Sequence, residues 1–263
     1  MSLTVVLGAL ELGGIFAIMS LGLYISYKIL NLPDLTVDGS FTLGCAVSAM
    51  FTIHSLPYLG LCVSFIAGAL AGVVTGLLIT KVKIMPLLSG ILTMTALYSI
   101  NLRIMGDSPN VSLFECSSIF TLFEFLGTYH KLIVIFVIVL LICIVLHYFL
   151  RTQLGLALRA CGDNEDMVRA SSIDTDKMKV LGLALANGFV AMGGAVFAQH
   201  QTCLLYTSLH IYQLMHQKER LPFPLHHYHN GLLLQWLEIL LNPKLVLQIY
   251  LLYMAFLYTP FYI

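Results

Sequence analysis

Long apolar segments separated by short polar ones make up most of this 263-residue chain. A membrane-spanning helix needs roughly 17–25 mostly apolar residues. Candidate spans lie at about 4–27, 40–54, 58–80, 84–104, 131–150 and 177–199, of which 40–54 is short. The pattern therefore predicts an all-α, multi-span helical membrane protein with about six recognisable spans.

Composition and charge support a lipid environment. Hydrophobic residues make up 59% of the chain and charged residues only 10%, whereas soluble domains carry about 25% charged residues. The formal net charge is +0, so nothing in it favours nucleic acid. The first residues, MSLTVVLGALELGG, contain no basic region and no small-residue cleavage site. We therefore expect an uncleaved first span.

The basic residues predict an orientation. Eight of them fall in one set of loops, while Arg103 and Lys131 flank the other set. The eight are Lys28, Lys81, Lys83, Arg151, Arg159, Arg169, Lys177 and Lys179. The positive-inside rule places the first set in the cytoplasm, so we expect the N-terminus outside and residues 151–176 inside.

Small residues recur on two of the predicted spans. Gly68, Gly72 and Gly76 follow one another at intervals of four, and residues 182–198 are rich in glycine and alanine. Small residues let helix backbones approach closely in lipid. We expect these two spans to pack tightly.

The composition changes at Cys203. Residues 1–202 contain 19 glycines and 16 alanines, whereas 203–263 contain one of each. Pro243 interrupts the apolar run 231–259, and Cys203–Ser208 resembles the translated end of a sequencing adapter. We expect a permease-like domain over 1–202 and an atypical, foreign or frame-damaged tail that packs loosely; a divergent C-terminal region is the alternative.

Polar interruptions supply the first candidate chemistry. Pro33 and Gly39 break the apolar pattern around Asp34 and Asp38, and Asp38 or Ser40 is predicted to cap the following helix. A broken segment with acids near a membrane is typical of a transport path or hinge. An ordinary loop is the alternative.

Two polar residues lie inside predicted spans. A carboxylate such as Glu11 costs roughly 2.5–3.5 kcal/mol at bilayer depth, so it should face the bundle or a water-filled path. It could instead lie near the outer interface. Asn187 is predicted to form an interhelical hydrogen bond. With Asp34 and Asp38, these residues are the candidates for lining a translocation path.

Residues 151–176 form a charged segment between two spans. We predict a short helix bracketed by Gly155 and Gly162, with Asp163, Glu165 and Asp166 near the start of the next helix, where acids complement the helix dipole. This segment suits contact with a soluble partner; a solvated loop is the alternative.

Motifs for catalysis or resident ligands are absent from the sequence. It contains no GxSxG, HExxH, P-loop or GxGxxG motif. The six cysteines and the cluster His226, His227 and His229 lack metal-ligand spacing. We predict no enzyme activity, cofactor or metal, so uphill transport would draw energy from a partner or an ion gradient.

Two blocks, 8–44 and 158–199, resemble the permease subunits of bacterial ABC importers, of the branched-chain amino-acid/ribose type. The resemblance covers about residues 5–201. It implies an all-helical, multi-pass inner-membrane protein used as a pair. It also implies a cytoplasmic ATP-binding subunit, which carries the ATP, and an extracytoplasmic substrate-binding protein.

The same resemblance implies an ATPase-coupling segment. Its positions are Gly155, Leu158, Arg159, Ala160, Gly162, Asn164, Ser172 and Ile173. The family continues after Gln201 with further glycine-rich spans, and this chain departs from it there.

The expected function is import of a small polar nutrient, with an amino acid as first candidate and a sugar or nucleoside as second. One rival is an ion-coupled secondary transporter that uses Glu11, Asp34 and Asp38 as ion sites. Another is a non-functional truncated permease.

Overall fold

A computed structural model describes residues 3–106, 110–113, 118–121, 129–201 and 203–205, all within the unit Met1–His210. The rest of the predicted tail and its histidine cluster lie outside the described residues. Six described helices are long and apolar enough to cross a membrane, which confirms the predicted all-α, multi-span fold.

The spanning helices lie close to the predicted segments. They are α1 (Leu3–Leu23) continued by the π-helix η1 (Tyr24–Ile29), α2 (Thr36–Ile53), α3 (Pro57–Thr80), α4 (Pro86–Ile104), α5 (His130–Arg151) and α8 (Thr175–Gln201). Pro57 and Pro86 begin their helices, because proline has a helical φ and lacks only an N–H that would be unpaired there. A short antiparallel pair joins β1 (Asn110–Ser112) to β2 (Cys203–Leu205).

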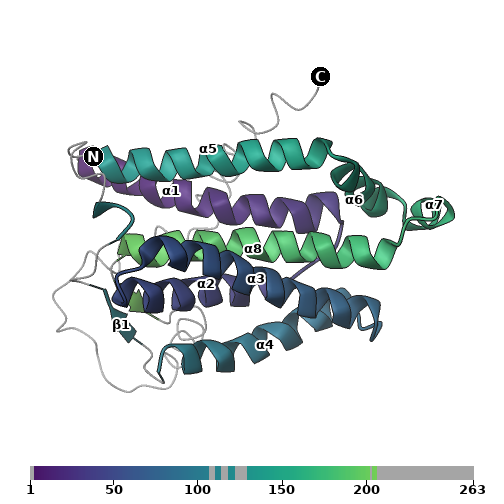
Figure 1. Cartoon of the computed structure of the whole chain (residues 1–263), viewed down its shortest axis with the longest axis horizontal. Helices are drawn as coiled ribbons and strands as arrows, with labels where there is room; N and C mark the ends of the chain where they lie inside the picture. The colour runs from purple at the N-terminus through teal and green to yellow at the C-terminus, as the bar shows by residue number, and fades with distance from the viewer. Residues whose placement is uncertain (1–2, 107–109, 114–117, 122–128, 202, 206–263) are drawn as a thin grey trace, which may run out of the picture. The chain divides into compact units, whose positions relative to one another are not determined.

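Helix α8 forms the centre of the bundle and packs against α1, α2 and α3 (Figure 1). A Cβ added to Gly68 would collide with Asn187 of α8, and one added to Gly72 would collide with Leu183. On α2, Gly44 meets the backbone of Ala191 in the same way. The prediction of tight packing between the small-residue spans is confirmed.

The loops separate into two groups at opposite ends of the bundle. At one end, a hollow is lined by the last residues of α3, by Lys83 in the loop after it, and by residues around Glu165 and Thr175. At the other end, Pro57 lines a hollow with Ser118 and accepts a hydrogen bond from Gln199 through its carbonyl oxygen. This separation agrees with the predicted alternation of loops.

Helix α2 begins in the interior of the bundle. Ser40 hydrogen-bonds to Asn187, which lies 12 residues after Thr175, or about 18 Å along a helix. The preceding irregular segment, 30–35, therefore enters the bundle deeply; we call it the re-entrant segment. Non-helical backbone is tolerated at membrane depth where protein buries it or water fills a cavity beside it.

The predicted cap of α2 is wrong. The helix begins at Thr36, so Asp38 and Ser40 already lie inside it. The N-cap residue is Leu35, which makes no side-chain cap, but the carboxylate of the preceding Asp34 accepts a 2.8 Å hydrogen bond from the Thr36 N–H. The sequence placed the helix start a few residues too late.

Candidate functional site

The predicted coupling segment folds into two short helices, α6 (Gln153–Asp163) and α7 (Glu165–Ala170). Helix α6 follows the end of α5 and lies against the first turns of α8, and α7 lies farther out (Figure 1). The Thr152 hydroxyl accepts from the Gly155 N–H and caps α6, while the Asn164 side chain accepts from the Met167 N–H at 3.1 Å and caps α7. These caps satisfy backbone donors that a helix start leaves unpaired.

Gly155 and Gly162 were predicted to flank the short helix, but both lie inside α6, so this prediction is wrong. Both glycines instead let the α6 backbone pack closely against its neighbours. A Cβ on Gly155 would collide with the backbone of Phe149 and Leu150, and one on Gly162 would collide with the Ile29 carbonyl. Both glycines therefore hold α6 against the ends of two spans.

The predicted coupling positions have different structural roles. Gly155, Leu158 and Gly162 pack toward the bundle, and Leu158 belongs to its largest hydrophobic core. Asn164 caps α7, and Ser172 follows it with a left-handed φ of 62°. The remaining three, Arg159, Ala160 and Ile173, are exposed.

An exposed strip on α6 includes residues that the sequence prediction missed. Leu156, Arg159, Ala160 and Asp163 lie at i, i+3, i+4 and i+7, the spacing of one helix face, and all four are exposed. Met167 on α7 is 69% exposed. We call these five residues the α6–α7 surface. The helical spacing could have identified the four α6 members from sequence, whereas an apolar residue such as Met167 gives no local sign of exposure.

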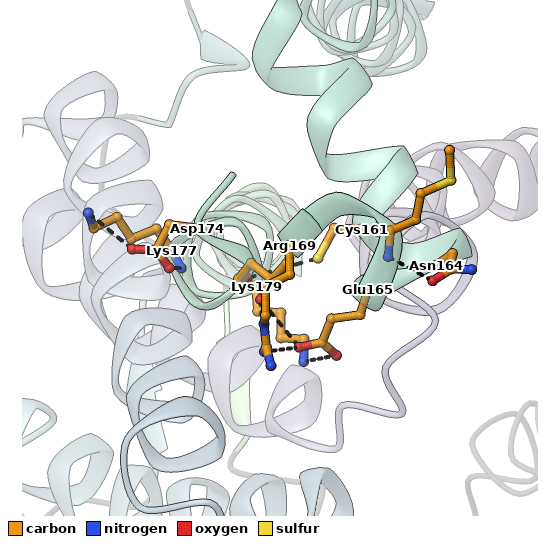
Figure 2. Close-up of polar contacts among 9 residues, drawn as sticks. Cys161, Asn164, Glu165, Arg169, Asp174, Lys177 and Lys179 are labelled. Carbon is orange, nitrogen blue, oxygen red and sulfur yellow. Dashed lines mark hydrogen bonds and ion pairs between the residues drawn. The ribbon is translucent and has the colours of Figure 1, made fainter. Parts of the chain in front are cut away.

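Glu165 is the centre of an ionic cluster between α7 and the start of α8 (Figure 2). Its carboxylate accepts from the Arg169 guanidinium at 2.9 Å, the Lys179 ammonium at 2.6 Å and the Thr175 hydroxyl at 3.3 Å. Lys179 and Thr175 belong to α8, so the cluster joins α7 to that helix. A second pair, Asp174 with Lys177, is more exposed.

The ionic cluster also predicts that the stability of the folded protein falls at acidic pH. The hydrogen bond from Lys179 is the largest cause that lowers the pKa of Glu165 below its ordinary value of 4.5. The pKa of Glu165 is lower in the folded protein than in the unfolded chain. The ionised carboxylate therefore stabilises the fold fully above about pH 4.5, and this stabilisation is lost as pH falls through the folded-state pKa. Because Glu165 is about a third exposed, the contribution is at most about 1 kcal/mol. Thermal unfolding of detergent-solubilised protein between pH 6 and 3 should therefore show a steeper loss of stability for wild type than for Glu165→Gln.

Two of the predicted path residues meet in the bundle interior. Asp34 is 3% exposed, and its second carboxylate oxygen accepts a 2.8 Å hydrogen bond from the Asn187 side-chain N–H. The side-chain amide oxygen of Asn187 in turn accepts a hydrogen bond from the Ser40 hydroxyl at 2.6 Å. This buried network joins the re-entrant segment and α2 to α8, and it confirms the interhelical hydrogen bond predicted for Asn187.

The other two path candidates lie apart from this network. Glu11 contacts the imidazole Nε2 of His200 at 2.9 Å, near the end of the bundle opposite α6 and α7. Asp38 is exposed, and its carboxylate makes no hydrogen bond or ion pair within the described part of the chain. Gly39 beside it packs against Met94, midway along α4. Asp38 therefore lies at bilayer depth.

Six helices long and apolar enough to span a membrane, with a short helical segment between the fifth and sixth, define a multi-pass membrane protein. A family described as "Branched-chain amino acid transport system / permease component" matches residues 5–211, and the chain belongs to this family. Its members are transport proteins of ABC systems, and the chain is accordingly a multi-pass inner-membrane protein.

Individual relatives differ in their named substrates. A tyrosine transport system permease from Clostridioides difficile is 41% identical over 70% of this chain, which spans 61% of that relative. A probable branched-chain amino acid permease from Methanocaldococcus jannaschii is 25% identical over 72% of the chain and 64% of the relative. A ribose import permease from Haemophilus influenzae is 25% identical over 73% and 59%. No solved structure matches the chain significantly.

Proposed function

We propose that this chain is the transmembrane subunit of an ATP-driven importer and contributes to the translocation path for a small polar nutrient. The α6–α7 surface carries the proposal. It combines apolar Leu156 and Met167 with charged Arg159 on a capped helical segment outside the spans. Such a surface suits a soluble ATP-binding subunit in the cytoplasm, as the basic loops also favour.

Among the path candidates, the exposure of Asp38 supports a role in contact with solute. A carboxylate at bilayer depth is too costly to face lipid, so its exposed side should face water or protein. A second copy of the permease would enclose a water-filled path along this face. Asp34 and Asn187 would then position the re-entrant segment without contacting solute.

The substrate proposed first is an amino acid delivered by an external binding protein. The 41%-identical relative named for tyrosine supports this choice, and a sugar is the second candidate because of the ribose relative. L-Tyrosine is therefore the first probe to use in uptake measurements.

The geometry gives little support to an ion-coupled carrier. Such a carrier would use Glu11, Asp34 and Asp38 as ion sites, but Glu11 contacts His200 and Asp34 contacts Asn187. Across the described residues, no group of three or more His, Cys, Asp or Glu side chains could hold a metal ion. Co-purification of an ATP-binding subunit would separate the two hypotheses.

Arg159→Glu tests the proposed contact. Reversing this charge on the α6–α7 surface should reduce the amount of co-purified ATP-binding subunit by about tenfold, equivalent to about 1.4 kcal/mol, and uptake should fall with it. Arg151→Glu is the matched control because Arg151 is exposed at the same end but lies at the last residue of α5.

Normal expression with unchanged co-purification and uptake in Arg159→Glu would exclude a coupling role for this residue. If wild type retains the ATP-binding subunit but does not take up tyrosine or ribose, the truncated-permease hypothesis gains support instead.

A further inference from the structure

The attachment of α7 to the bundle depends on few contacts. Val168 is the buried residue of this short helix. The remaining attachment passes through Glu165, which binds Lys179, whose side chain is only 17% exposed. Arg169 strengthens the same junction, because its guanidinium reaches both Glu165 and the hydroxyl of Thr175, the first residue of α8.

The helix held by this junction also holds the re-entrant segment. Lys179 and Asn187 are eight residues apart on α8, which places them about 12 Å apart along the axis and about 80° apart around it. Asn187 then contacts Asp34 and Ser40. The ionic cluster and the buried network are therefore joined by just over two turns of one continuous helix.

Small-residue packing favours movement of this helix as a unit. The glycines of α2 and α3 bring their backbones directly against α8 at Leu183 and Ala191, so a local bend would force backbone atoms into contact. Tightly packed elements shift as rigid units and do not deform continuously. A displacement of α8 at Lys179 would therefore move Asn187 by a similar distance.

We infer that Glu165 is a positioning residue that transmits movement of α6 and α7 to α8, and through Asn187 to the re-entrant segment beside Asp38. This inference rests on the proposed contact between the α6–α7 surface and an ATP-binding subunit. It assigns Glu165 a task separate from binding that subunit, since its carboxylate is bound by Lys179 and Thr175 of α8.

The experiment measures hydrogen–deuterium exchange at the start of α2 in the full chain complexed with its ATP-binding subunit. Exchange over 34–42 is compared with and without a non-hydrolysable ATP analogue. In wild type, nucleotide should change this exchange by about tenfold, within the usual range of allosteric coupling. Glu165→Gln and Lys179→Gln should each retain the ATP-binding subunit but lose most of the change.

A charge exchange distinguishes transmission from general stability. The double variant Glu165→Lys with Lys179→Glu restores an opposite-charge pair and should restore the response to nucleotide. The matched control is Asp174→Asn, which removes the exposed ion pair with Lys177 and should leave the response unchanged.

The possible failures are distinct. If the wild-type chain does not bind the ATP-binding subunit, the proposed function fails, and the inference fails with it. If the subunit binds but nucleotide leaves residues 34–42 unchanged in wild type, or if Glu165→Gln responds like wild type, only the transmission by Glu165 is overturned.

Discussion

Gly72→Leu should prevent the bundle from folding stably in the membrane. A Cβ at this position would collide with the Leu183 carbonyl and lie 2.8 Å from the Ala184 Cα. Overpacking a core costs about 1–3 kcal/mol even where side chains can shift. Here the obstacle is the backbone of the central helix, so we expect a loss of at least about 3 kcal/mol. Thermal unfolding of detergent-solubilised protein and the amount inserted in membranes measure the effect.

Gly13→Leu is the matched control for this substitution. Gly13 also lies in a spanning helix, but nothing lies within 4 Å of an added Cβ. Replacing a helical glycine there should be neutral or slightly stabilising, since glycine is disfavoured in helices by roughly 1 kcal/mol relative to alanine. Equal stability of the two leucine variants would contradict the close approach of α3 and α8.

Asn187→Leu should have the second largest effect. The substitution keeps an apolar side chain of similar size in the bundle but removes the donor to Asp34 and the acceptor for Ser40. A buried polar group left without its hydrogen bond costs about 1–3 kcal/mol, and the substitution leaves two such groups, on Asp34 and Ser40. A lowered unfolding temperature in detergent, with insertion retained, is the expected measurement.

The double variant Asp34→Leu with Asn187→Leu tests the coupling between the two side chains. Its loss should be smaller than the sum of the single losses, because the double variant leaves no buried carboxylate without its partner. Asp38→Asn serves as the control, since Asp38 is exposed near the same network. Strict additivity of the two single effects would mean that the hydrogen bond contributes little.

The sequence predicted the spans because hydrophobic length is a local property. All six segments recur as helices with similar bounds, including the short second one. The glycines at intervals of four on α3 correctly predicted that this helix packs closely, although not which helix it meets, and the acidic start of α7 was also predictable. These features depend on composition and spacing within one element, so no knowledge of neighbouring helices is needed.

Only the tertiary structure decided which polar groups meet. Asp34 and Asn187 are 153 positions apart in sequence, and Glu11 and His200 are 189 apart. Their contacts depend on how each helix is rotated and at what level it crosses the bundle. Backbone contacts at glycines such as Gly44 and Gly72 fix the height at which each helix meets α8. A sequence pattern indicates which face of a helix packs, but not which residues of the neighbouring helix lie opposite that face. For the same reason, the sequence could only group three acids and one amide as candidates for a single path. In the structure, Asp34 and Asn187 form a buried hydrogen-bond network, whereas Asp38 is exposed.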